Sequence, residues 1–206
     1  MCEMVQKPRF TSVGQIARLQ AAAMPTTSRV GDPEEDETMA SARPVLSRIN
    51  ALGFVTVDSQ MGTKGGGGYT HWQRAYVSGF VASSVAKRFV RAMNAADGVL
   101  VLAFPHGEEQ PEAGKAFAMK RMPRVSLTIE ARLDTATSHP LAVAQPFSSM
   151  WAALLPELGL RGDGASMKAV AADATQVLVV DMVWGRKTWL FKTVQRCLRD
   201  LSTETQ

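Results

Sequence analysis

Cysteine is scarce in this chain of 206 residues, which contains only two. They lie far apart, at positions 2 and 197, so they provide neither a disulfide framework nor the clustered thiols of a metal site. Long apolar runs are also missing, because no stretch approaches the roughly 18 residues that span a bilayer. The first residues, MCEMVQKPRFTSVGQ, lack the continuous apolar core of a secretory signal. We therefore expect an intracellular, cytoplasmic protein of a reducing compartment, with no membrane association.

Signatures of metal and cofactor binding are absent as well. His106 and His139 do not have the paired spacing of a zinc set. The sequence contains no Walker pattern, no G-x-G-x-x-G before a helix, no G-x-S-x-G elbow and no H-E-x-x-H. These absences predict no cofactor and no metal.

Charge of neither sign dominates. The chain has 23 Lys and Arg against 19 Asp and Glu, a formal net charge of +4. A mild basic surplus assists contact with phosphates, but dedicated nucleic-acid binders concentrate their bases more heavily and place aromatic residues among them. The composition therefore argues against DNA or RNA as a partner.

Two parts of unequal length are indicated. Residues 1–40 predict a flexible N-terminal arm, because PTTSRVGDPEEDETMAS combines turn formers with an acidic run and has little to bury. Within this arm, IARLQAAAM is compatible with a short helix. A solvated linker is the simpler interpretation of the acidic run, and binding of a protein partner or self-association through the arm is the alternative. Residues 41–206 predict a single α/β domain.

The apolar periodicity of residues 41–206 alternates between helix and strand. Helical spacing occurs in residues 41–53, 83–98, 146–159 and 188–201, and strand patterns occur in residues 54–60, 73–81, 99–104, 125–133 and 176–184. Both faces of residues 54–60 are mostly apolar, so we expect this strand at the centre of its sheet. The order of elements predicts an α/β or α+β fold in which helices pack against a mixed sheet of about five strands.

A first candidate site lies at the edges of the glycine-rich segment GGGG, residues 65–68. These glycines lead into a strand, whereas a phosphate-binding loop leads into a helix. We therefore expect the glycines to form a mobile connection between two strands. If the flanking strands pair as neighbours, their polar ends meet at one sheet edge, where binding sites are often built. The alternative is structural, with Arg74 paired to Asp58. The residues concerned are Asp58, Ser59, Gln60, His71, Trp72, Gln73 and Arg74.

A second candidate follows the strand of residues 176–184. Asp181 interrupts an apolar strand, and a buried carboxylate needs a partner. Arg186, Lys187, Arg74 and His71 are candidate partners, and Trp184 stands at the end of the same strand. A ligand site and a simple structural Asp–Arg pair are both consistent with this pattern.

Three stretches carry a resemblance to a known family. INALGFVTVDSQMG, QRAYVSGF and VVDMVWGRKTWLF resemble an uncharacterised family of actinobacterial and large-DNA-virus proteins, which share a G-F-x-T-x-S-Q strand motif. The resemblance covers residues 44–80 and the last strand. It implies no activity, but it allows a viral source and hence a location in the virion.

Three functions remain open at this point. We expect a non-catalytic binding or interaction module with a polar site at strand ends beside the glycine-rich loop, for a small anionic ligand that Arg and amide groups hold. The first alternative is a structural protein of a virion or other assembly. The second is a small hydrolase or transferase that uses Asp58 or Asp181 with His71 as acid and base.

Overall fold

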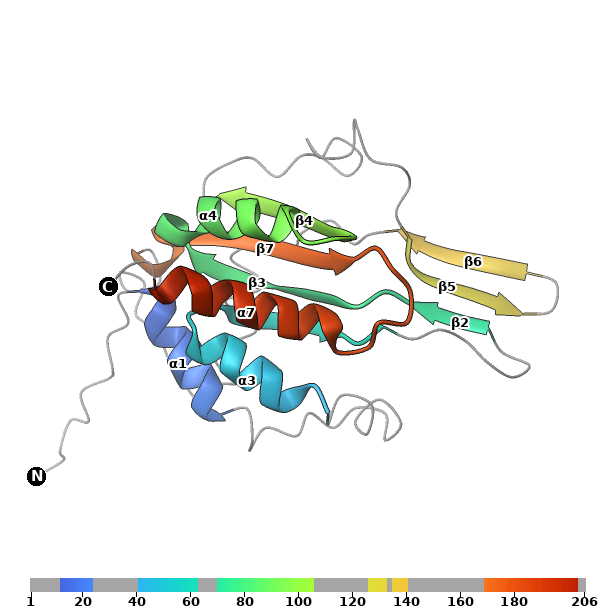
Figure 1. Ribbon diagram of the computed structural model, residues 1–206, viewed down its shortest axis with the longest axis horizontal. Coiled ribbons are helices and arrows are strands. Elements are labelled where there is room, and N and C mark those ends of the chain that lie inside the picture. The colour runs from blue at the N-terminus through green and yellow to red at the C-terminus, as the bar shows by residue number, and fades with distance from the viewer. Residues whose placement is uncertain are drawn as a thin grey trace, which may run out of the picture.

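Figure 1 shows the computed structural model, which describes residues 12–23, 41–62, 70–105, 126–132, 135–140 and 169–203. Side chains are described for residues 12–23, 41–62, 74–103 and 169–203. The predicted helix at 146–159 and the glycines 65–68 lie outside these ranges. The helices are α1 (Val13–Ala23), α3 (Arg43–Ala51), α4 (Ser83–Asn94) and α7 (Trp189–Thr203). The strands are β1 (Val55–Gln60), β2 (Thr70–Gln73), β3 (Tyr76–Ala82), β4 (Val99–Pro105), β5 (Ser126–Arg132), β6 (Thr135–Pro140) and β7 (Ala174–Asp181).

The main sheet has four strands in the order β1-β3-β7-β4, and every neighbouring pair is antiparallel. A second sheet, β2-β5-β6, is also antiparallel. The predicted class, an α/β or α+β fold with helices against a sheet, is confirmed, but both sheets are antiparallel throughout and not mixed. The main sheet has one strand fewer than expected, because the predicted strand at 125–133 pairs in the second sheet as β5.

β7 occupies an inner position of the main sheet, and all eight of its residues are buried. β1, which we expected at the centre, lies at the edge instead. Phe54 and Val55 are nevertheless fully buried, because α1 and α3 pack against this edge strand. Apolar residues on both faces of a strand indicate that other elements cover both faces, and an edge strand can be covered in this way as well as a central one.

A layer of helices covers one face of the main sheet, with α7 between α3 and α4 (Figure 1). The helices contribute Ile49, Phe89, Leu190 and Phe191 to the core, all fully buried. The ring centroids of Phe54 and Phe89 are 5.9 Å apart, within the range of favourable aromatic pairs. The described helices include none that is long and apolar enough to cross a membrane.

α1 belongs to this packed body. Val13, Ile16 and Ala17 are buried, and the side-chain amide of Gln20 donates a hydrogen bond to the carbonyl oxygen of Thr56 in β1. The predicted short helix at 16–24 is therefore confirmed, but its assignment to a flexible arm is wrong for residues 13–23. The apolar spacing of this helix was present in the sequence. The acidic run that follows it led to the assignment of the whole segment to a flexible arm, although the helix has a surface to pack on.

Asn50 fastens the end of α3 to β1 from a fully buried position. Its Nδ2 donates to the Leu46 carbonyl and to the Thr56 hydroxyl, both at 2.8 Å. Its Oδ1 accepts the Thr56 backbone N–H at 3.0 Å. Beyond this anchor, α3 ends at Ala51 and Gly53 has a φ of 97°, the left-handed conformation that glycine tolerates best.

We predict that Asn50→Ala lowers the free energy of unfolding by about 2–3 kcal/mol, because it leaves the buried N–H of Thr56 without its acceptor. Urea denaturation of both proteins measures this difference. Ser47→Ala is the matched control on the same helix, since it removes one half-buried bond to the Ala21 carbonyl and should cost about 1 kcal/mol. Equal losses for the two variants would contradict the role given to Asn50.

Candidate functional site

Arg74 lies where the two sheets join. β2 ends at Gln73 in the second sheet and β3 begins at Tyr76 in the main sheet, so only Arg74 and Ala75 connect them. The carbonyl oxygen of Ala75 accepts the backbone N–H of Asp181 at 2.8 Å. The connection is thereby held against the end of β7.

The guanidinium of Arg74 packs on the segment that follows β7. Its carbon Cζ lies 3.9 Å from the centroid of the Trp184 ring, and its Nη1 donates to the Met182 carbonyl oxygen. Burial lowers the pKa of Arg74, and the negative charge of Asp181 partly offsets that effect. The side chain therefore carries a positive charge with reduced access to water, beside an aromatic face.

Asp181 has its charge partner in Arg186. The carboxylate is fully buried and accepts the Val183 backbone N–H at 2.8 Å. Its oxygens lie 3.0 and 2.8 Å from Nε of Arg186, and Oδ1 also accepts a bond from Nη2. This fork-like pairing is the strong form of an Arg–carboxylate contact.

Arg186 extends this anchor to the neighbouring elements. Its Nη2 donates to the carbonyl oxygens of Asp97 at 3.2 Å and Gly98 at 3.5 Å, in the turn between α4 and β4. Its Cζ lies 3.5 Å from the centroid of the Trp189 ring, at the start of α7. One side chain thus ties together the end of β7, the α4–β4 turn and the first residue of α7. Of the two interpretations of Asp181, the structural ion pair describes this geometry.

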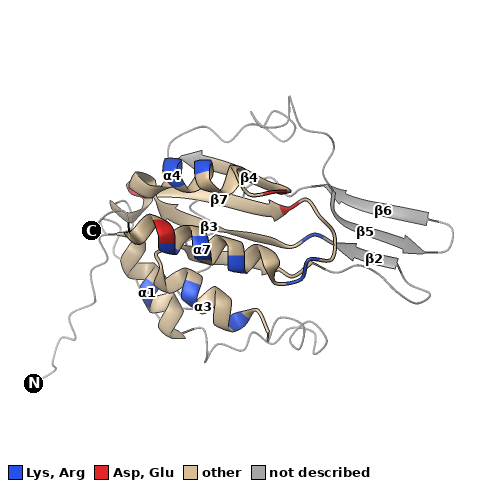
Figure 2. Ribbon diagram, in the orientation of Figure 1, with Lys and Arg blue, Asp and Glu red and all other residues tan. Residues whose placement is uncertain are grey.

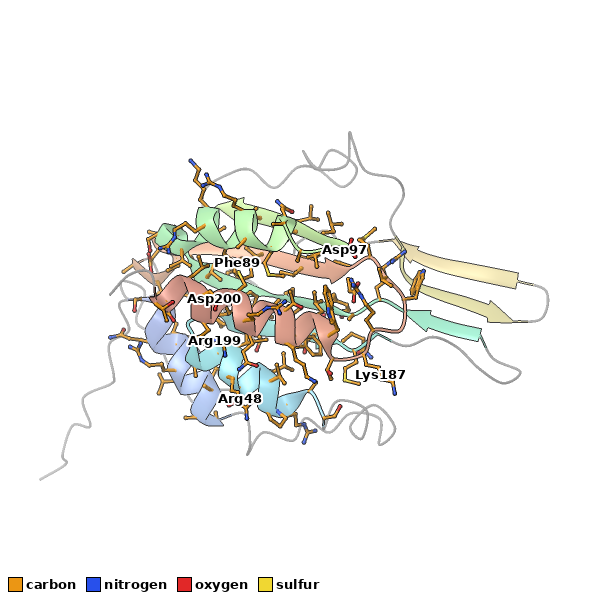
Figure 3. The ribbon with its side chains drawn as sticks, viewed as in Figure 1. Arg48, Phe89, Asp97, Lys187, Arg199 and Asp200 are labelled. Atoms are coloured by element: carbon orange, nitrogen blue, oxygen red, sulfur yellow. The ribbon has the colours of Figure 1, made fainter. Side chains whose placement is uncertain are left out.

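The loop between β7 and α7 contains two left-handed residues, Gly185 with φ 78° and Lys187 with φ 43°. Lys187 forms an antiparallel bridge with Gly62. The segment after Gln60 and the segment after Trp184 are therefore neighbours. Figure 3 shows the side chain of Lys187 in this loop and that of Asp97 in the α4–β4 turn.

The three predicted site residues of β1 follow the antiparallel register with β3. Asp58, Ser59 and Gln60 lie opposite Ser78, Val77 and Tyr76, respectively. The carboxylate of Asp58 is exposed and accepts the hydroxyl of Tyr76 at 2.8 Å. These residues stay on the main sheet, at its outer strand.

His71, Trp72 and Gln73 do not join them in that sheet. They belong to β2, where their register partners are Glu130, Ile129 and Thr128 of β5. The strands that flank the glycine-rich segment do pair as neighbours, because β1 is antiparallel to β3 and Gln60 lies opposite Tyr76. β3 begins only at Tyr76, however, and residues 71–73 pair with β5 in the second sheet. The side chains of these three residues lie outside those that the structure describes.

Four of the predicted residues do come together: Arg74, Asp181, Trp184 and Arg186. The Met182 carbonyl contacts Arg74 and the Trp189 ring contacts Arg186, and neither was expected from the sequence. The spacing of Trp189, three residues after Arg186 at a helix start, was the one available signal. Among the residues whose side chains are described, no group of three or more His, Cys, Asp or Glu is placed to hold a metal.

The fold and this cluster define an α+β protein with a helix-covered antiparallel sheet and a charged, aromatic cluster at the exit of its inner strand β7. Residues 17–115 match the model of a domain of unknown function, DUF6919. That match includes residues 44–80, one of the two parts of the chain that carry the resemblance to an uncharacterised family, and it does not include the other part, the last strand. No curated protein matches the chain.

Proposed function

We propose that this protein is a non-catalytic binding module for a small anionic ligand, with Arg74 as the principal contact. The observation that supports it is the half-buried guanidinium of Arg74, which lies on Trp184 and whose Nη1 donates to the Met182 carbonyl. Such a tether fixes the plane of the guanidinium. A fixed plane with directional N–H groups is suited to carboxylate or phosphate recognition.

The charges around β7 also favour an anion. Arg186 donates to both carboxylate oxygens of Asp181. The negative charge of Asp181 is therefore balanced by Arg186 before Arg74. Arg74 and the exposed Lys187 add positive charge at the same end of the sheet. Because burial disfavours the charged form of Arg74, a bound anion would stabilise it.

The enzymatic alternative has less support from this geometry. Asp181 accepts several hydrogen bonds in a buried ion pair, which leaves it poorly suited to exchange protons with a substrate. Asp58 and His71 belong to strands of different sheets. The binding function asks only that Arg74 and its aromatic support be presented on a stable scaffold.

Thermal denaturation in the presence of inorganic phosphate, ATP or citrate tests the proposal. A probe that binds the native state at a hundredfold excess over its Kd stabilises the protein by about 2.7 kcal/mol. For a chain of this size we expect the midpoint to rise by roughly 5–10 °C. Arg74→Lys keeps the charge but removes the planar fork, so it should abolish the rise while changing the midpoint of the unliganded protein by only a few degrees.

Arg196→Lys is the matched control. It makes the same chemical change at an exposed position on α7 and should leave the response to the probe intact. If Arg74→Lys retains the full rise of the wild type, the assignment of Arg74 is wrong. If none of the three probes shifts the wild-type midpoint, the anion-binding proposal fails.

A further inference from the structure

The positive charge of this protein is concentrated in three helices. Together α3, α4 and α7 contain eight Lys or Arg and a single acid, Asp200. Their surplus of seven positive charges exceeds the +4 of the entire chain, so the remainder has a net negative charge. The basic residues are Arg43, Arg48, Lys87, Arg88, Arg91, Lys192, Arg196 and Arg199.

Figure 2 shows Lys and Arg along all three helices of this layer, and six of the eight are exposed. The apolar residues of α4 and α7, such as Phe89 and Leu198, face the sheet and are buried. We call the exposed bases of this layer the basic helical face. It consists of Arg48, Lys87, Arg91, Lys192, Arg196 and Arg199, all exposed.

Stability alone does not account for this arrangement. Lys87 and Arg91 are four residues apart on α4, and Lys192 and Arg196 are four residues apart on α7. Like charges at this spacing destabilise a helix, whereas an acid at one of the two positions would stabilise it. Ordinary solvated surfaces mix both signs. Here the single acid, Asp200, lies 3.8 Å from Arg199 in an exposed pair, which contributes little.

The side chains on and around this face indicate which kind of polyanion it can bind. The aromatic residues of α4 and α7 turn inward: Phe89 and Phe191 are fully buried, and Trp189 lies beneath Arg186. The face therefore lacks the stacking platform that single-stranded nucleic acids use. Membrane binding would be helped by apolar side chains beside the bases, but the large exposed apolar residues described, Leu19 and Val183, lie on other elements.

We propose that the basic helical face binds the phosphate backbone of double-stranded nucleic acid without sequence specificity. The composition of the whole chain argued against such a partner, but eight bases and one acid are gathered on three neighbouring helices. Several Lys and Arg held on rigid helices match the regular negative charge of a duplex, and release of its counterions drives such binding. The partner is distinct from the small anion proposed for Arg74, which lies outside this face. Arg74→Lys should leave duplex binding unchanged, so each proposal can fail alone.

Fluorescence anisotropy with labelled DNA and RNA duplexes of about 25 base pairs tests the inference, with salt varied between roughly 50 and 200 mM. The wild type should bind with an affinity that falls steeply as salt rises. Lys87→Glu/Lys192→Glu should weaken binding at least tenfold and flatten the salt dependence, because each reversed charge removes about one phosphate contact. Both the DNA duplex and the RNA duplex should bind if the phosphate backbone is the target. Binding of the RNA duplex alone would indicate a preference for A-form geometry.

The double variant separates binding from folding. Each new Glu lies four residues before an Arg, at Arg91 and Arg196, which is the favourable order for a helical ion pair. Its thermal midpoint should therefore equal or exceed that of the wild type. Loss of binding by a protein of undiminished stability is the result that supports the inference.

Two controls complete the design. Lys87→Arg/Lys192→Arg keeps both charges and should bind as the wild type does. Lys187→Glu reverses an exposed charge in the loop before α7, outside the face, and should weaken binding much less than Lys192→Glu alone. Equal weakening by these two single variants would overturn the inference. Absence of duplex binding by the wild type at 50 mM salt, including the case in which only phosphatidylserine vesicles bind, would overturn it as well.

Discussion

Asp181→Ala is expected to lower the free energy of unfolding by about 3 kcal/mol, because it leaves the guanidinium of Arg186 without its carboxylate. This loss is at the lower end for a broken buried pair, because the Arg186 side chain retains 22% exposure while that of Asp181 has none. The Val183 backbone N–H loses its acceptor in the same change. Urea denaturation with a common slope for both proteins measures the loss.

Two further variants decide whether the ion pair causes this loss. Asp181→Leu/Arg186→Met removes both charges and should recover much of the stability, because an apolar replacement of a buried pair is often neutral. Asp58→Ala removes an exposed carboxylate with one bond to Tyr76 and should cost at most about 1 kcal/mol. A double variant as unstable as Asp181→Ala would show that packing around the strand end, and not the unpaired charge, dominates.

Gly79→Ala is expected to cost about 3 kcal/mol or more, because the main sheet has no room for a methyl group at this position. A Cβ atom there would lie 1.9 Å from the Val55 carbonyl oxygen and 2.6 Å from Cε1 of Phe54. Gly79 faces the irregular register of β1 between Thr56 and Asp58. The nearest obstacle is backbone, so β1 and β3 would have to separate.

Gly14→Ala is the control of opposite sign. Gly14 lies within α1, and the nearest heavy atom to an added Cβ is Nη1 of Arg18 at 3.8 Å. Alanine favours a helix over glycine by about 1 kcal/mol, so this variant should be slightly more stable than the wild type. Thermal denaturation of both glycine variants gives the comparison. A Gly79→Ala protein with a wild-type midpoint would refute the close contact.

Local pattern was sufficient for most of the elements. The nearly continuous apolar run at 176–184 and the helical stripe at 188–201 predicted β7 and α7, because a sheet interior and a helix face impose those patterns directly. The same reasoning misplaced β1 at the sheet centre. Its first residues are buried on both faces, but coverage of the faces by other elements does not tell whether a strand lies at the centre or the edge of its sheet.

The candidate site was predictable only where its members are close in the chain. Asp181, Trp184 and Arg186 follow one another, and a buried acid before a Gly-Arg segment suggests its own partner. The pairing of β1 with β3 was correctly expected, but His71, Trp72 and Gln73 form a separate strand that pairs with β5. Which strand a segment pairs with depends on competing partners distant in the sequence.

By itself, the sequence determined the class of fold, the helices and strands with strong periodicity, and the need of Asp181 for a counter-ion. Tertiary structure alone decided that Arg74 rests on Trp184 and that the bases of α3, α4 and α7 share one outer face. Periodicity is a property of neighbours along the chain, and it orients each helix toward or away from the core. The proximity of charges on different helices depends on how those helices pack, which no single segment encodes.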